Sequence, residues 1–220
     1  MGSRSVTDAV MLDALGTLVE LEPPWVHLAE ALGTDADERL IRAVRTEMAY
    51  YKAHSQEGRN AASLADLRRR CADVLSRELG RPVDVETLMA SIRFRAFPDS
   101  LPALTALRDA GLRLVCVSNW DCSLEEVLQR CGLGSAIDAV ITSAATGRRK
   151  PDPAIFDPAL AWAKCAPERA LYVGDTPEED LEAARRAGIP ALLIARGGGG
   201  DISSLEELVA LVGGRRPGAT

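Results

Sequence analysis

Four positions along the chain carry polar side chains that could act together on an anion. They are Asp13, the pair Ser118-Asn119, Lys150, and Asp175. Carboxylates can hold a hard cation such as Mg²⁺, while a lysine and a serine hydroxyl suit the oxygens of a phosphate. A carboxylate that faces an anion held in this way is a candidate nucleophile. The sequence therefore predicts a metal-and-phosphate site if the fold brings these positions together.

The elements that must position these side chains alternate regularly from about residue 100 onward. The predicted strands are 112–117, 137–141, 170–173 and 191–194, and the predicted helices are 101–110, 123–130, 154–164, 177–187 and 205–211. Short apolar strands that alternate with helices indicate an α/β fold, a Rossmann-like parallel sheet wrapped by helices. Asp13 ends an earlier apolar run, 10–12. Because ligands bind at the carboxyl ends of such strands, we expect the four positions to meet at one edge of the sheet.

Residues 22 to about 95 show a helical pattern and no strand-like run. Two apolar stripes at helical spacing are Leu40, Val44, Met48 and Tyr51, and Leu64, Leu67, Cys71, Val74 and Leu79. Such stripes are typical of a small helical bundle. We therefore expect an all-helical cap domain at 20–95, inserted into an α/β core formed by residues 1–19 and 96–220.

Composition excludes several function classes. The formal net charge of −6 leaves no basic footprint, so a nucleic-acid partner is not expected. No apolar run approaches the roughly 20 residues that span a bilayer, so no membrane partner is expected either. The five cysteines are scattered without a CxxC pair, which is typical of reduced thiols in a cytoplasmic protein. Composition leaves open whether the chain is a monomer or a homodimer.

The polar positions belong to four motifs, which follow one another in the order Asp13-Ala14-Leu15-Gly16-Thr17, Val117-Ser118-Asn119, Lys150-Pro151-Asp152-Pro153, and Gly174-Asp175 through Asp180. In this order, the motifs resemble those of the haloacid dehalogenase superfamily of hydrolases, and specifically of its members with a helical cap after the first motif. The resemblance implies that Asp13 is the nucleophile and that Ser118 and Lys150 bind the transferring group. It also implies a Mg²⁺ site, whose expected ligands are Asp13, the backbone carbonyl of Leu15, Asp175 and Asp180. Thr17 would orient the loop after the nucleophile.

Leu15 departs from the pattern that the resemblance implies. Phosphatases of the superfamily usually carry a second aspartate two residues after the nucleophile, which protonates the leaving group and then activates water. A leucine does neither, and such acid–base help is worth about 10²–10⁴-fold in rate. The favoured interpretation is a slow Mg²⁺-dependent phosphatase acting on a small phosphate ester. The alternatives are a 2-haloacid dehalogenase-like hydrolase, since halide leaves without a proton, and a catalytically impaired protein that binds a ligand or partner.

The predicted cap carries candidate substrate-binding residues near the end of one helix. Together with the core positions, the candidate substrate-binding residues are Thr17, Tyr51, His54, Arg59, Ser118, Asn119 and Lys150. His54 is the one nearby group that titrates near neutral pH, so it is a hypothetical replacement for the missing acid–base group. The alternative is that the cluster is an ordinary surface helix end. The run Arg68-Arg69-Arg70 is interpreted as a solvated flank, with the alternative that one of its arginines turns toward the cleft. Glu179 is interpreted as an ordinary acid in the first turn of a helix.

Overall fold

A five-stranded parallel sheet forms the centre of the computed structural model, which describes residues 7–213. Its order is β5-β4-β1-β6-β7. The strands are β1 (Ala9–Leu12), β4 (Arg113–Ser118), β5 (Ala139–Thr142), β6 (Ala170–Gly174) and β7 (Ala191–Leu193). All four residues of the central strand β1 are buried, because strands flank it on both sides and helices cover both faces. The α/β prediction is confirmed.

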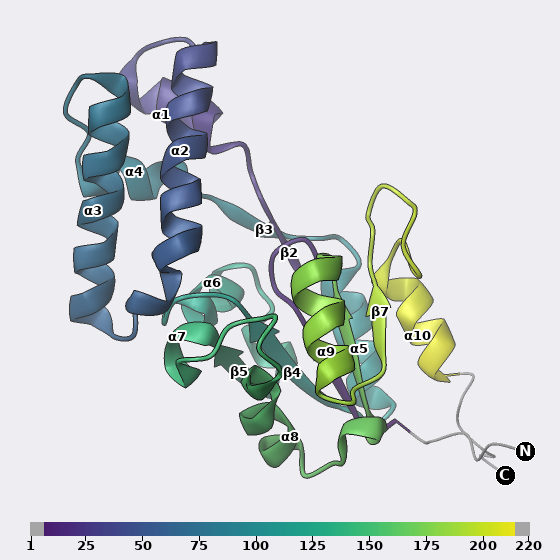
Figure 1. Cartoon of the computed structure of the whole chain (residues 1–220). Helices are drawn as coiled ribbons and strands as arrows, with labels where there is room; N and C mark the ends of the chain where they lie inside the picture. The colour runs from purple at the N-terminus through teal and green to yellow at the C-terminus, as the bar shows by residue number, and fades with distance from the viewer. Residues whose placement is uncertain (1–6, 214–220) are drawn as a thin grey trace, which may run out of the picture.

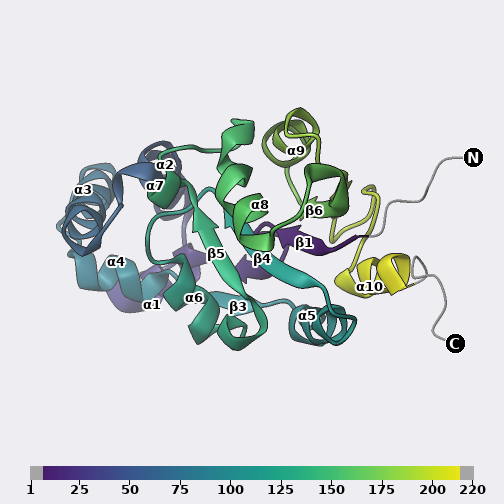
Figure 2. The ribbon, with the colours of Figure 1, turned by 90° about the horizontal axis from the view of Figure 1, so that it is seen from below.

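Successive residues of β1 point to opposite faces of the sheet and so divide the core into two layers. Val10 and Leu12 pack against α5 (Ser100–Asp109), α6 (Leu124–Arg130) and α10 (Leu205–Gly213). Ala9 and Met11 pack on the other face. There they contact η3 (Pro153–Phe156), α8 (Asp157–Ala163) and α9 (Glu182–Arg186). Figure 2 shows the sheet between these two helical layers.

Four helices form a separate lobe above one end of the sheet (Figure 1). They are α1 (Pro24–Leu32), α2 (Glu38–His54), α3 (Ala61–Leu79) and α4 (Val85–Ser91). The lobe has its own apolar core, in which the predicted stripes of α2 and α3 meet around Val44, Leu67 and Cys71. Asp37 caps the N-terminus of α2, since its carboxylate accepts a hydrogen bond from the Leu40 amide.

Two short antiparallel strands connect the lobe to the sheet. They are β2 (Val19–Leu21) and β3 (Phe94–Ala96), paired with Val19 opposite Ala96 and Leu21 opposite Phe94. The expectation of no strand between residue 22 and about 95 is therefore wrong at its C-terminal edge. Three residues are too few to show the alternation that identifies a strand in sequence. Only pairing with a segment more than 70 residues away in the chain reveals β3.

Short helical turns complete the structure between these elements. They are η1 (Ser55–Glu57), η2 (Gly134–Ala136), α7 (Ser143–Thr146), η4 (Pro167–Arg169) and the π-helical turn η5 (Pro177–Leu181). The helix predicted at 177–187 thus begins with η5 and continues as α9. Within residues 7–213, no helix has the length and apolar character needed to cross a membrane.

Helix α5 offers a matched test of the core. The Leu104 side chain is fully buried against β1, whereas Leu101, on the same helix, is 45% exposed. We expect Leu104→Ala to lower the free energy of unfolding by about 2–5 kcal/mol, because it leaves a cavity in a packed layer. Leu101→Ala should change it by no more than about 0.5 kcal/mol. Urea unfolding of both variants measures the difference, and equal effects would contradict this assignment of the core.

Candidate functional site

The four predicted positions do meet at the carboxyl edge of the sheet. Asp13 directly follows β1, Ser118 ends β4, and Asp175 directly follows β6. Because β1 lies between β4 and β6, Asp13 sits between the other two. Lys150 reaches the same place from the long connection after β5. Parallel strand order therefore brings together residues that lie up to 162 positions apart in the sequence.

The Lys150 ammonium is buried at the centre of this site. Its Nζ donates hydrogen bonds to Asp13 Oδ1 at 2.5 Å, to Asp180 Oδ1 at 2.5 Å and to the Tyr172 hydroxyl at 2.7 Å. The Tyr172 hydroxyl in turn donates to Asp180 Oδ1 at 2.7 Å. Burial opposes the charge on Lys150, but the two carboxylates outweigh it and hold its pKa above the ordinary lysine value. Lys150 is therefore a permanent cation whose position is fixed from three sides.

The backbone of Lys150 is held as firmly as its side chain. Its amide donates to Asn119 Oδ1 at 2.8 Å, and Asn119 Nδ2 donates back to the Lys150 carbonyl at 3.0 Å. Asn119 Nδ2 also donates to Glu179 Oε2 at 2.9 Å. Asn119 lines the cavity described below, but both ends of its amide serve Lys150 and Glu179. In this structure the Asn119 side chain therefore positions the Lys150 loop.

Three carboxylates converge beside Lys150. Oxygens of Asp13, Asp175 and Asp180 lie within 4.8 Å of one another. Burial raises the pKa of Asp13 and of Asp175, and the nearby Asp180 charge raises both further. The glycines of the two motifs make this convergence possible. A Cβ on Gly16, whose φ is +80°, would overlap the Asp175 carboxylate, and one on Gly174 would overlap Asp180.

The charge balance of this cluster fits a divalent cation. Three carboxylates face one ammonium, which leaves two negative charges in a partly buried site. The oxygens of Asp180 are already engaged, since Oδ1 pairs with Lys150 and Oδ2 accepts the Thr176 amide at 2.9 Å. The carboxylate oxygens of Asp13 and Asp175 are less engaged in hydrogen bonds, and carboxylate oxygens are the ligands that Mg²⁺ prefers. The residues present therefore fit a magnesium ion.

A cavity of about 540 Å³ extends from the carboxylate cluster to the helical lobe. The core contributes Asp13, Ser118, Lys150 and Asp175 to its wall, and the lobe contributes mainly apolar side chains, including Met48, Leu88 and Met89. The Leu15 side chain, 40% exposed, lies in the cavity wall two residues after Asp13. A cavity with apolar side chains and a few convergent polar groups is the arrangement expected of a small-molecule site.

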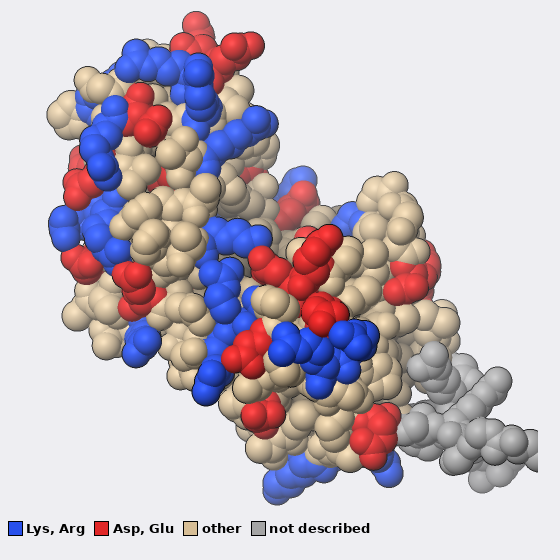
Figure 3. Space-filling view, in the orientation of Figure 1, with Lys and Arg blue, Asp and Glu red and all other residues tan. Residues whose placement is uncertain are grey.

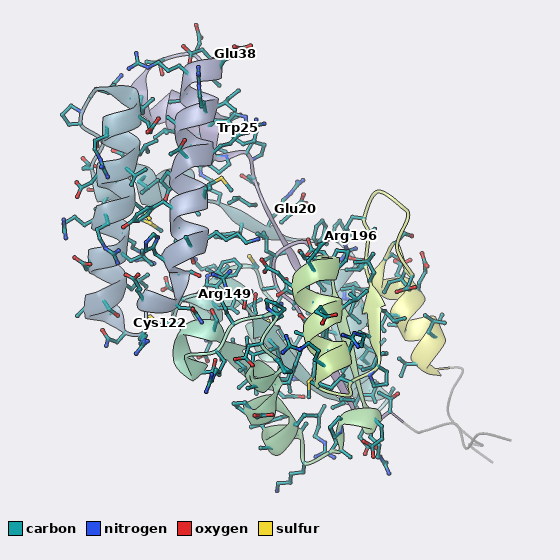
Figure 4. All side chains as sticks on the ribbon, in the orientation of Figure 1. Glu20, Trp25, Glu38, Cys122, Arg149 and Arg196 are labelled. Atoms are coloured by element: carbon teal, nitrogen blue, oxygen red, sulfur yellow. The ribbon has the colours of Figure 1, made fainter. Side chains whose placement is uncertain are left out.

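Polar contacts close the lobe against the core. The Tyr51 hydroxyl donates to Asp121 Oδ2 at 2.8 Å. Lys52 Nζ pairs with Glu179 Oε1 at 2.9 Å, and Arg149 Nη1 donates to the Lys52 carbonyl at 3.2 Å. Figure 3 shows basic and acidic side chains meeting along this junction, and Figure 4 places Arg149 beneath the lobe. Glu179 is therefore a link between α2 and the Lys150 loop, not an ordinary first-turn acid. No sequence pattern indicates this contact, because Lys52 and Glu179 lie 127 positions apart in the chain.

Three predicted substrate-binding residues do not line the cavity. The His54 ring stacks on Tyr50, with 4.0 Å between ring centroids, and its Nδ1 pairs with the Tyr50 carbonyl at 2.7 Å. This contact turns His54 back along its own helix, so the geometry does not support it as the replacement acid–base group. Arg59 is exposed and bonds locally, while Thr17 is fully buried beneath the loop. Tyr51, the remaining lobe candidate, does line the cavity.

The charged residues Arg68 and Glu47 also line the cavity, and Glu47 was not among the candidates. Arg68 is part of the cavity wall, whereas Arg69 is exposed and pairs with Asp66, so one arginine of the run does turn toward the cleft. Glu47 also lines the cavity and is only 5% exposed. The sequence feature that could have identified Glu47 was its position within an apolar stripe. Glu47 interrupts the apolar stripe of α2 between Val44 and Tyr51.

The stability of the buried cluster depends on Lys150. We expect Lys150→Met to lower the free energy of unfolding by about 3–5 kcal/mol in metal-free buffer, because it leaves buried carboxylates without their cation. A carboxyl whose pKa is raised in the folded state makes folding less favourable as it ionises with rising pH. The loss of unfolding free energy in Lys150→Met should therefore be larger near pH 8 than near pH 5. Chemical unfolding at both pH values measures it. Lys52→Met is the control, since that lysine is exposed and should cost less than about 1 kcal/mol. A deficit independent of pH would contradict the account.

Comparisons with known proteins agree with this geometry. The chain is 41% identical over 92 residues to haloacid dehalogenase-like hydrolase domain-containing protein 3 of Bos taurus, a match over 42% of this chain and 37% of that protein. The chain thus spans well under half the length of that relative. It is 31% identical over 182 residues to a phosphoserine phosphatase of Thermus thermophilus, covering 80% of this chain and 70% of the relative. A glyceraldehyde 3-phosphate phosphatase of Methanopyrus kandleri is 28% identical over 205 residues, covering 86% and 84%.

Solved structures share the fold over nearly the whole chain. A haloacid dehalogenase (HAD) superfamily phosphatase from Thermococcus onnurineus superposes with a TM-score of 0.68 at 25% identity, covering 96% of this chain and 100% of that one. An L-2-haloacid dehalogenase from Xanthobacter autotrophicus superposes with a TM-score of 0.74 at 21% identity and the same coverage. A family model described as haloacid dehalogenase-like hydrolase matches residues 7–188. With Asp13, Lys150, Asp175 and Asp180 together at the sheet edge and the family model matched over residues 7–188, this chain belongs to the haloacid dehalogenase-like hydrolases.

Proposed function

We propose that this hydrolase is a Mg²⁺-dependent phosphatase that acts on a small phosphate ester through a phosphoaspartate on Asp13. The observation that carries the proposal is the convergence of Asp13, Asp175 and Asp180 around the buried Lys150 ammonium. This arrangement offers a carboxylate nucleophile and sites for a cation beside one cavity. Relatives named as phosphoserine phosphatase and glyceraldehyde 3-phosphate phosphatase support a phosphate-ester substrate.

Each residue of the core has a role in the proposed reaction. An oxygen of Asp13 attacks the phosphorus, the P–O bond to the leaving alcohol breaks, and its electron pair departs on the alcohol oxygen. Lys150 holds Oδ1 of Asp13, which fixes the direction of the carboxylate and offsets charge near the phosphoryl group. The Ser118 hydroxyl lies near Asp13 and is placed to bind a phosphoryl oxygen. Water then cleaves the phosphoaspartate and releases inorganic phosphate.

Magnesium would be held by Asp13, Asp175 and the backbone carbonyl of Leu15, with Asp180 supporting the site. When bound, it supplies charge neutralisation for the phosphoryl oxygens. Asp180 supports the site chiefly through the groups it already binds, Lys150 and the Thr176 amide. Positioning and charge neutralisation provide most of the catalysis of phosphoryl transfer, so we expect this set of groups to support turnover.

The helical lobe serves as a cap in this proposal. It closes one side of the cavity and shields the reacting groups from bulk water. The contact of Tyr51 with Asp121 and the Lys52–Glu179 ion pair hold the lobe in this position. Arg149 and the Cys122 amide add hydrogen bonds to the Lys52 and Gly58 carbonyls at the same junction. Substrate entry by opening of the lobe would require these junction contacts to separate.

The magnesium requirement and the role of Asp13 are tested together. Phosphate release from a panel of small phosphate esters should require Mg²⁺, stop when a chelator is added, and return when the ion is restored. Asp13→Asn should reduce the rate to background, because an amide does not attack phosphorus. A colorimetric phosphate assay measures each step. Full activity of Asp13→Asn, or of the wild type in chelator, would rule out this mechanism.

Leu15 sets the rate in this proposal, because its side chain cannot protonate the leaving alcohol. We expect Leu15→Asp to raise kcat by at least about tenfold, by supplying part of the acid–base help worth about 10²–10⁴-fold. Leu15→Asn is the matched control, since it is polar and nearly isosteric with aspartate but titrates no proton. Steady-state kinetics on the best ester decide the point. An equal gain in both variants would mean that polarity, and not proton transfer, is what position 15 lacks.

One observation favours dehalogenation as a second candidate. Leu15 places an apolar side chain beside the nucleophile, and halide leaves without needing a proton. In that case Asp13 would displace halide from a 2-halo acid, forming an ester that water hydrolyses. Halide release from chloro-acids that survives chelator would support this reaction over phosphate transfer. The paired Asp175 and Asp180, which a metal-free displacement does not need, favour the phosphatase.

A further inference from the structure

Glu47 is a buried carboxyl that the proposed reaction does not use. It lies on α2 at a position where the helix otherwise buries apolar residues, with Val44 one turn before it and Tyr51 one turn after it. It is only 5% exposed, yet it forms part of the cavity wall. Placing a carboxylate here opposes the packing of the lobe, because a buried charge costs free energy unless it is paired.

Nothing in the described part of the chain neutralises this carboxyl. Its one hydrogen-bond partner there is the Cys71 thiol, a weak and uncharged donor on α3. Burial raises the pKa of Glu47, and no basic group offsets that effect. Arg68 and Lys52 also line the cavity but do not pair with it. The carboxyl is therefore left to interact with whatever enters the cavity.

The position of Glu47 along α2 decides which part of a ligand it meets. Tyr51 contacts the core loop at Asp121, and Glu47 lies one turn farther from the core, about 6 Å along the helix axis. Figure 4 shows the direction of α2, with Glu38 at the end most distant from the core. Asp13 and Glu47 line the same cavity, one from the core and one from the lobe. The ester substituent of a phosphoryl group held at Asp13 would therefore occupy the space that Glu47 borders.

We propose that Glu47 recognises an ammonium group on the leaving-group side of the substrate, so that the preferred esters are phosphates of amino alcohols or hydroxy amino acids. This inference rests on the proposed phosphatase function and specifies its substrate class. A ligand ammonium supplies the missing cation and forms a charge-assisted hydrogen bond, which is about twice as strong as a neutral one. A neutral alkyl group leaves the carboxyl buried and unpaired, so it is rejected.

Binding of two matched esters tests the inference without requiring turnover. 2-Aminoethyl phosphate and propyl phosphate have the same number of heavy atoms and differ in the ammonium group. On the Asp13→Asn protein with Mg²⁺, calorimetry should show at least about tenfold tighter binding of the aminoethyl ester. Adding Glu47→Gln should remove that preference, whereas adding Glu38→Gln, at an exposed site on the same helix, should keep it. Equal binding of both esters, or a preference that survives Glu47→Gln, overturns the inference.

A stability measurement separates recognition from a structural role. Glu47→Met restores the apolar stripe of α2 and should raise the Tm by about 2–4 °C, because a buried unpaired carboxyl is removed. A fall in Tm would mean that Glu47 holds the lobe together, and it would overturn the inference. Failure of the phosphatase proposal would give a different result from failure of the Glu47 inference. The wild type would then hydrolyse neither ester, while the Glu47-dependent binding preference persisted.

Discussion

The site depends on one buried ion cluster, in which the Lys150 ammonium is held between Asp13 and Asp180. A lysine this deeply buried keeps its charge only because carboxylates surround it. The carboxylates in turn are kept close together only because the ammonium offsets part of their repulsion. The Asp13 and Asp180 carboxylates and the Lys150 ammonium are thus one electrostatic unit, and a change in any member alters the others.

The parallel sheet explains how distant segments build this unit. Strands β4, β1 and β6 lie side by side, and each delivers a polar residue where it ends. Lys150 comes from a loop and needs additional support, which Asn119 provides through both ends of its amide. The same asparagine contacts Glu179, which pairs with Lys52 of the lobe. Closure of the lobe and placement of Lys150 are therefore physically linked.

The sequence predicted the core well because its signals there are local. Apolar strands that end in polar residues revealed the sheet edge, and Asp13, Ser118, Lys150 and Asp175 meet as expected. The lobe wall was predicted less well, because which residues face the cavity depends on how helices pack. His54 turns back on Tyr50, and Arg59 stays at the surface. Glu47 was missed, Arg68 was covered only by the alternative that one arginine of its run faces the cleft, and β3 is recognisable only through its pairing with β2.

The most direct test of the central claim is to find the covalent intermediate. The protein would be mixed with a small phosphate ester and Mg²⁺, quenched in acid within a turnover, and digested for peptide mass spectrometry. We expect phosphate on Asp13, present only with Mg²⁺ and absent from Lys150→Met, which lacks the cation that orients the carboxylate. A phosphate on another residue would contradict the account, as would an Asp13 that remains unmodified while phosphate is released.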